Sequence, residues 1–256
     1  MKDFEFFDQY QCGISIIACV FLTISYVASL YVWRTNLSRD HPSTIKRRFF
    51  SVLCMMIMAP FFVQFFFTNE TISRGDLLHH LGLRWSGLTA AIFVPLLLTA
   101  ILFLGPFIAC CNFRSYFEAG WRDLVWVRNH IMAPLSEEWV FRACMIPLLL
   151  QCIDPMTTVF VGPLLFGIAF QFTYTSMFGA YSSYLFLRTG HFVSPLVAHI
   201  FCNHMGFPNF LEIGEFPPLQ RVLIVLTFIL GLGLWCYLLT PLTSPEIYDN
   251  RLNWET

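Results

Sequence analysis

Three ionisable side chains interrupt an otherwise apolar stretch of the chain. Glu137, Glu138 and Arg142 lie in the segment Ala133–Leu150, whose other residues are mostly hydrophobic. In a helix Glu138 and Arg142 share a face, because they are four residues apart, and they can form an ion pair in the favourable order. Glu137 is rotated by about 100° from Glu138. The spacing therefore predicts one neutralised carboxylate and one spare carboxylate. In a dry site the spare one suits a general base that activates water.

A second polar pair lies further along the chain. His199 and Asn203 are four residues apart in another apolar run, so that a helix places both on one face. Both side chains can donate hydrogen bonds to one point, as an oxyanion hole requires. A histidine and an asparagine in such a helix also serve as simple interhelical hydrogen-bond partners. Facing Glu137, however, they would form a minimal arrangement for adding water to an amide carbonyl.

The composition places these groups in an integral membrane protein. Of the 256 residues, 57% are hydrophobic and 12% are charged, whereas about 25% charged residues is usual in a soluble domain. The mean hydropathy is +0.64, and one soluble core cannot bury so large an apolar share. Collagen, disordered chains and secreted disulfide scaffolds are excluded as well. The net charge of -1 offers no basic surface for nucleic acid.

Apolar runs long enough to cross a bilayer recur along the chain. The clearest are Cys12–Trp33, Phe49–Phe67, Leu88–Cys111 and Val222–Leu239, with less pure runs at Ile131–Ile153 and Ser194–Phe207. The uncharged run Met156–Leu187 is too long for one upright helix and short for two helices with a loop. We expect an all-α fold, a single polytopic domain (1–256) with about 6–8 membrane helices around an intramembrane cavity.

Placing the charged side chains of this segment inside a bilayer is energetically costly. Each charge near mid-membrane costs about 2.5–3.5 kcal/mol on insertion scales, so these side chains must face a protein interior or water, and some must pair. A structural explanation stays open: Ser136 would cap a helix near the membrane boundary, with Glu137 and Glu138 favourably placed in its first turn.

The charges of the loops predict an orientation. The segment Arg34–Arg48 holds five basic residues and one aspartate, so the positive-inside rule places it in the cytosol and the N-terminus on the other side. Counting spans forward puts 68–87 in the lumen and 112–130 in the cytosol. Asn69 begins a glycosylation sequon in the lumenal loop.

The two motifs together resemble a known family. Glu-Glu-x-x-x-Arg (137–142) followed by His-x-x-x-Asn (199–203) is similar to the type II CAAX prenyl endopeptidases, and the runs 141–145, 186–191 and 201–208 also resemble the eukaryotic enzymes. The resemblance covers Ala133 to Pro208, and the catalytic core would span about 131–208.

This resemblance implies proteolysis within the endoplasmic reticulum membrane. The partners would be membrane lipid and farnesylated or geranylgeranylated CAAX proteins, such as small GTPases, from which the last three residues are removed. Glu137 would activate the water, His199 and Asn203 would stabilise the oxyanion, and Glu138 and Arg142 would shape and neutralise the site. The family implies no cofactor and no metal.

The sequence departs from the family at one motif. The family carries Phe-x-x-x-His, whose histidine works with the first glutamate on the water. Here the matching phenylalanine is Phe166, and Phe170 stands where the histidine belongs. The neighbouring residues pass directly into a segment that resembles one further downstream. We therefore interpret the chain as lacking a histidine-bearing block of a few dozen residues, through a splice variant or a gene-model error, and as impaired in catalysis.

Three other functions remain compatible with the sequence. Without the histidine, the chain is alternatively a non-catalytic binder of prenylated tails. A transporter or channel would line an ion path with buried charges, but it predicts symmetric halves with broken helices, which the sequence lacks. A zinc protease would use Glu137, Glu138 and His199 as ligands.

Overall fold

The computed structural model describes residues 2–67, 77–109, 122–167, 172–208, 210 and 212–250. Within these ranges the regular elements are helices and there is no strand, which confirms the predicted all-α fold. The sequon at Asn69 lies outside the described residues, and so does Phe170.

Three of the described helices are long and apolar enough to cross a membrane. They are α1 (Lys2–Tyr31), α2 (Pro42–Gln64) and α14 (Pro218–Leu242), and they contain most of three predicted spans. In α2 the fixed ring of Pro42 suits the first helical turn, where its missing N–H costs nothing, and the His41 side chain accepts a hydrogen bond from Ser43 N.

The predicted span Leu88–Cys111 divides into two helices, α5 (Leu88–Leu102) and α6 (Leu104–Ala109). Both pack against α14. A side chain at Gly231 of α14 would place its Cβ 2.7 Å from the carbonyl oxygen of Ile101. The absence of a side chain there therefore allows the two backbones to approach closely.

The predicted segment Ile131–Ile153 falls within one continuous helical stretch with two π-helical turns. In order it comprises α8 (Leu124–Val127), η1 (Arg128–Met132), α9 (Ala133–Glu138), η2 (Trp139–Cys144) and α10 (Met145–Leu149). Every residue from Val140 to Leu149 is buried. It contacts α1, α2, α11, α12 and α13, so this charged helix forms the centre of the bundle.

The long uncharged run forms two helices, α11 (Pro155–Gly167) and α12 (Phe172–Thr189), which pack side by side. The 13 described residues of α11 extend over about 20 Å. The next helix, α13 (Val193–Met205), carries His199 and Asn203. Three short elements complete the described chain, α4 (Leu77–His80), η3 (Glu212–Glu215) and η4 (Pro245–Tyr248).

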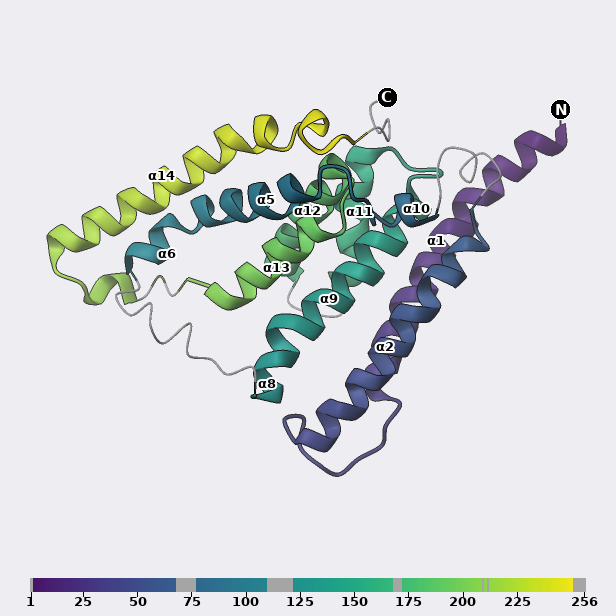
Figure 1. Cartoon of the computed structure of the whole chain (residues 1–256), viewed down its shortest axis with the longest axis horizontal. Coiled ribbons are helices and arrows are strands. Elements are labelled where there is room, and N and C mark those ends of the chain that lie inside the picture. Colours follow the sequence, from purple (N-terminus) through teal and green to yellow (C-terminus); the bar gives the residue numbers. More distant parts are fainter. Residues whose placement is uncertain are drawn as a thin grey trace.

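The helices run between two ends of the molecule (Figure 1). The α1–α2 loop and α8 lie toward the lower side of the view, and the N-terminal end of α1 and the C-terminal end of α14 lie at its upper side. Arg128 Nη1 forms a 2.7 Å ion pair with Asp40 Oδ1 of the α1–α2 loop, and this cation holds the pKa of the Asp40 carboxyl below its usual value. The ion pair agrees with the prediction that the segments 34–48 and 112–130 lie on one side of the membrane.

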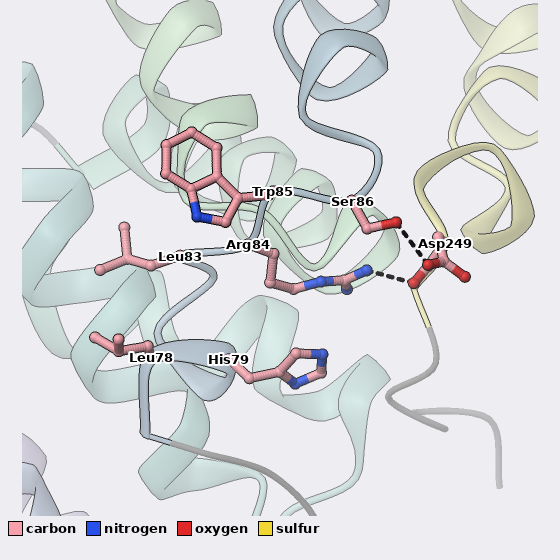
Figure 2. A pocket seen from close by; sticks show the side chains of 7 residues that line it. All are labelled: Leu78, His79, Leu83, Arg84, Trp85, Ser86 and Asp249. Atoms are coloured by element: carbon pink, nitrogen blue, oxygen red, sulfur yellow. Dashed lines mark hydrogen bonds between the residues drawn. The ribbon is translucent and has the colours of Figure 1, made fainter.

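At the opposite end, a hydrogen-bond network attaches the C-terminal segment to the bundle. Arg84 donates to the carbonyl oxygens of Tyr248 and Asp249 and to Asn250 Oδ1, and Ser86 Oγ donates to Asp249 Oδ2 over 2.6 Å. Figure 2 shows both Arg84 and Ser86 directed at Asp249, beside an open pocket of about 510 Å³. Burial raises the pKa of the Tyr248 phenol to about 12. This pocket lies away from Glu137 and Glu138.

Candidate active site

The carboxylate of Glu138 is the centre of a buried polar cluster. It is fully buried and accepts three hydrogen bonds: from Arg142 Nη1 at 3.1 Å, from Ser182 Oγ at 2.6 Å and from His199 Nδ1 at 2.6 Å. A buried anion needs such donors, because removal from water is otherwise costly. Four elements, α9, η2, α12 and α13, are joined at this one side chain.

The ion pair expected from the four-residue spacing is present. Glu138 and Arg142 share a face although the intervening turn is π-helical. Arg142 Nη2 also lies 3.5 Å from the carbonyl oxygen of Gly179, where a Cβ at Gly179 would crowd Pro163 of α11 at 2.7 Å. The missing side chain at Gly179 thus lets α12 approach both α11 and the guanidinium.

Glu137 occupies a different position from Glu138, as its rotation around the helix requires. Its side chain is 26% exposed, and its Oε2 lies 3.8 Å from His199 Nε2. That distance exceeds a direct hydrogen bond. His199 therefore lies between two carboxylates, hydrogen-bonded to Glu138 through one ring nitrogen and facing Glu137 through the other. The Phe178 ring lies against the imidazole, with ring centroids 4.8 Å apart.

Asn203 does not join this cluster in the structure. It lies one turn beyond His199, is exposed, and donates from Nδ2 to the carbonyl oxygen of Asn129 over 2.9 Å. In the structure His199 and Asn203 therefore donate to different acceptors and do not point at one site, contrary to the expectation from the sequence. The carboxamide must leave Asn129 before it can reach a ligand beside His199.

Sequence reasoning missed Ser182. Its hydroxyl is fully buried and donates to a carboxylate 44 positions away in the chain. Gly179 and Ser182 are three residues apart in α12, and both contact the Glu138–Arg142 pair. Two small residues at helical spacing are typical of close membrane-helix contacts, and this is the signal that the sequence held.

Replacing Ser182 with alanine is expected to lower the free energy of unfolding by about 1.5–3 kcal/mol, the usual contribution of a hydrogen bond to a charged group. Thermal unfolding in detergent measures the change. Ser183→Ala is the matched control, because Ser183 is as deeply buried in the same helix but is rotated by about 100° from Ser182. Equal shifts for the two variants would contradict a specific role for Ser182.

The zinc alternative can be compared with this geometry. Among the described residues, no group of three His, Cys, Asp or Glu side chains is arranged to hold a metal ion. Glu138 already accepts hydrogen bonds from Arg142, Ser182 and His199, so a metal held by Glu137, Glu138 and His199 would compete with these donors for its oxygens.

The fold and this cluster define a class: an α-helical membrane protein with two carboxylates, a guanidinium and an imidazole gathered between its helices. Comparison with known families gives a more particular assignment. Residues 119–205 match the family model described as "Type II CAAX prenyl endopeptidase Rce1-like". That match contains both motifs of the cluster.

Curated relatives extend the similarity over most of the chain. "CAAX prenyl protease 2" of Homo sapiens is 41% identical over 278 residues, covering 93% of this chain and 84% of the relative. The Rattus norvegicus protein of that name is 41% identical, covering 93% and 83%, and that of Arabidopsis thaliana is 30% identical, covering 96% and 94%. The chain belongs to the type II CAAX prenyl endopeptidase family of proteases. Among solved structures, none matches it.

Proposed function

We propose that this chain is an intramembrane endopeptidase that removes the C-terminal tripeptide from prenylated CAAX proteins, and that the form described here works slowly. The observation that carries the proposal is the position of His199 between the two adjacent carboxylates, in contact with Glu138 at 2.6 Å and facing Glu137 at 3.8 Å. The names of the relatives indicate the substrate class, CAAX proteins carrying a prenyl group.

The geometry supports distinct roles for the two carboxylates. Glu138 is saturated with donors, so it orients His199 and balances Arg142. Glu137, which is nearer the surface, is the general base. We place the attacking water beside Glu137 Oε2 and His199 Nε2, where it hydrogen-bonds to both side chains.

The proposed reaction is a general-base hydrolysis. Glu137 takes a proton from the water as its oxygen attacks the carbonyl carbon of the scissile peptide bond. His199, in its protonated form, donates from Nε2 to the resulting oxyanion, while Nδ1 stays on Glu138. Before the attack, two carboxylates, one guanidinium and one imidazolium carry no net charge; after it, the oxyanion replaces the charge of the protonated Glu137. The C–N bond breaks as Glu137 returns the proton to the leaving amine. Asn203 becomes a second oxyanion donor if its amide leaves Asn129.

The position of the cluster supports access from the cytosol. Asp40 belongs to the basic segment that the positive-inside rule places there, and Arg128 pairs with it. Glu138 lies ten residues further along the helix, about 15 Å deeper. Substrates such as small GTPases present their C-termini on that side of the endoplasmic reticulum membrane, the membrane we propose for this chain.

One observation supports the missing histidine block. An alignment of 278 positions is longer than the 256 residues of this chain. Because 93% of the chain is about 238 residues, about 40 positions hold a residue in the human relative and none here. The same calculation gives about 20 such positions for the rat relative and about 55 for the Arabidopsis relative.

The same observation favours a second candidate function. A chain that retains the membrane helices but lacks a group that acts on the water would bind prenylated tails without cleaving them. General acid–base groups contribute about 10²- to 10⁴-fold in rate, so loss of one converts a protease into a very slow enzyme or, in practice, a binder.

Membranes without endogenous activity separate the two candidates. A farnesylated CAAX peptide is offered to the full chain, and its binding and the release of its tripeptide are measured. We expect the unaltered chain to bind the peptide and to release its tripeptide slowly. In Glu137→Gln we expect the release to be abolished and the binding to persist. Binding without release favours the second candidate, and absence of binding contradicts both. Ser183→Ala serves as the control for expression and folding.

A further inference from the structure

Two histidines from different helices meet at the end of the site that faces the α1–α2 loop. The rings of His130, in η1, and His204, in the last turn of α13, have centroids 5.8 Å apart. His130 stacks on Trp126 with centroids 4.7 Å apart and an interplanar angle of 18°. Both histidines are half-buried, and neither contacts the carboxylate of Glu138. Arg128 lies two residues before His130, and its guanidinium is paired with Asp40.

The His130 ring is held in place before any ligand arrives. Its Nδ1 donates to the carbonyl oxygen of Trp126 over 3.0 Å, in addition to the stacking contact. A ring fixed in this way loses little conformational entropy on binding, which favours affinity. An imidazole N–H donates to an ionised carboxylate in a charge-assisted hydrogen bond.

The distance from the catalytic cluster to this pair matches the length of the segment to be removed. His130 precedes Glu137 by seven residues, about 10 Å along the helix, with part of η1 between them. His204 follows His199 by five residues, about 7–8 Å along its helix. An extended tripeptide spans about 10 Å. A substrate with its scissile carbonyl beside Glu137 and His199 therefore reaches the two histidines with its C-terminus.

The bilayer favours the same direction. A free carboxylate is costly in hydrocarbon, so the new end of the chain must lie where water or cations are available. The Arg128–Asp40 pair marks the membrane boundary at this end. A substrate that ran in the other direction would place its carboxylate among the buried residues Val140–Leu149.

We propose that His130 and His204 bind the free C-terminal carboxylate of the substrate and thereby set the length of the removed segment at three residues. This inference rests on the proposed function and adds to it the group that recognises the end of the peptide. The pair does not touch the reacting atoms, so it determines specificity and not the chemistry.

Binding measurements test the inference without requiring turnover. Two farnesylated peptides are compared in detergent-solubilised full-length protein, one ending in a carboxylate and one in a carboxamide. We expect about tenfold tighter binding of the carboxylate peptide, the effect of one charge-assisted hydrogen bond. In His130→Gln/His204→Gln the ratio is expected to fall to about one. A peptide with four residues after the prenylated cysteine is expected to lose the advantage as well.

The ratio of the two affinities is its own control for folding, because misfolding weakens both peptides alike. His204→Gln alone, at the last turn of α13, is expected to give an intermediate ratio. His79→Gln, in the pocket at the opposite end (Figure 2), is expected to leave the ratio unchanged. Equal binding of both peptides by the unaltered protein would overturn this inference and leave the proposed function intact. Binding of neither peptide would overturn both.

Discussion

Replacing Glu138 with alanine is expected to lower the free energy of unfolding by about 3–5 kcal/mol, the cost of breaking a buried ion pair from one side. The variant would leave the Arg142 guanidinium, of which 6% is exposed, without its anion. It would also remove the acceptor of His199 Nδ1 and Ser182 Oγ. Because four helical elements meet at this carboxylate, the loss affects the packing of the whole centre of the bundle.

Thermal or denaturant unfolding in a defined detergent measures this effect. Glu137→Ala is the matched control: the adjacent carboxylate is 26% exposed, and its removal is expected to change stability by less than 1 kcal/mol. In Glu138→Leu/Arg142→Met both charges are removed together, which is expected to be less destabilising than Glu138→Ala alone. Similar melting of Glu138→Ala and Glu137→Ala would show that Glu138 does not organise the site.

Local spacing was sufficient to predict one half of this cluster. The Glu138–Arg142 pair depends only on the 3.6-residue period and on the cost of unpaired charge in an apolar helix, and it is present at 3.1 Å. The α-helical class and three long spans follow from composition and run length, and the structure confirms them.

The other half depends on contacts between distant segments. His199 was expected opposite Glu137, yet its hydrogen bond is to Glu138, 61 positions away. Which of two neighbouring carboxylates a third helix meets depends on how that helix is rotated and tilted. The π-helical turn η2 directly after Glu138 also changes the helical phase locally. A regular helical period read from a single sequence predicts neither the orientation of α13 nor the position of the π-helical turn.

The contact made by Asn203 also could not be predicted from spacing alone. Its four-residue spacing from His199 does place it on the correct helix face, but a backbone carbonyl at Asn129 takes its amide. Backbone acceptors at π-helical turns cannot be read from residue types, because they arise from the geometry of η1. The sequence therefore predicts which residues share a face more reliably than which atoms they contact.

Restoring the missing block is expected to raise the rate of tripeptide release by about 10²- to 10⁴-fold, the usual contribution of a general acid–base group. The insertion is placed between Ala169 and Phe170, so that its first residue is the histidine four positions after Phe166 that this chain lacks. Release is followed with a farnesylated CAAX peptide in membranes without endogenous activity.

Two further variants separate the histidine from the helix that carries it. Phe170→His restores the spacing from Phe166 without lengthening α11, and we expect it to recover only a small part of the rate, because a misplaced base is much less effective. The full insertion with alanine in place of its histidine tests the side chain alone and is expected to stay near the slow rate of the present chain. Should that insertion be as active as the one with histidine, proton transfer would not need this residue, and the slow rate would instead come from the shortened helix. If neither insertion releases the tripeptide faster than the present chain, the proposal that a histidine-bearing block is missing would be contradicted. The alternative function, a binder of prenylated tails, would then be supported.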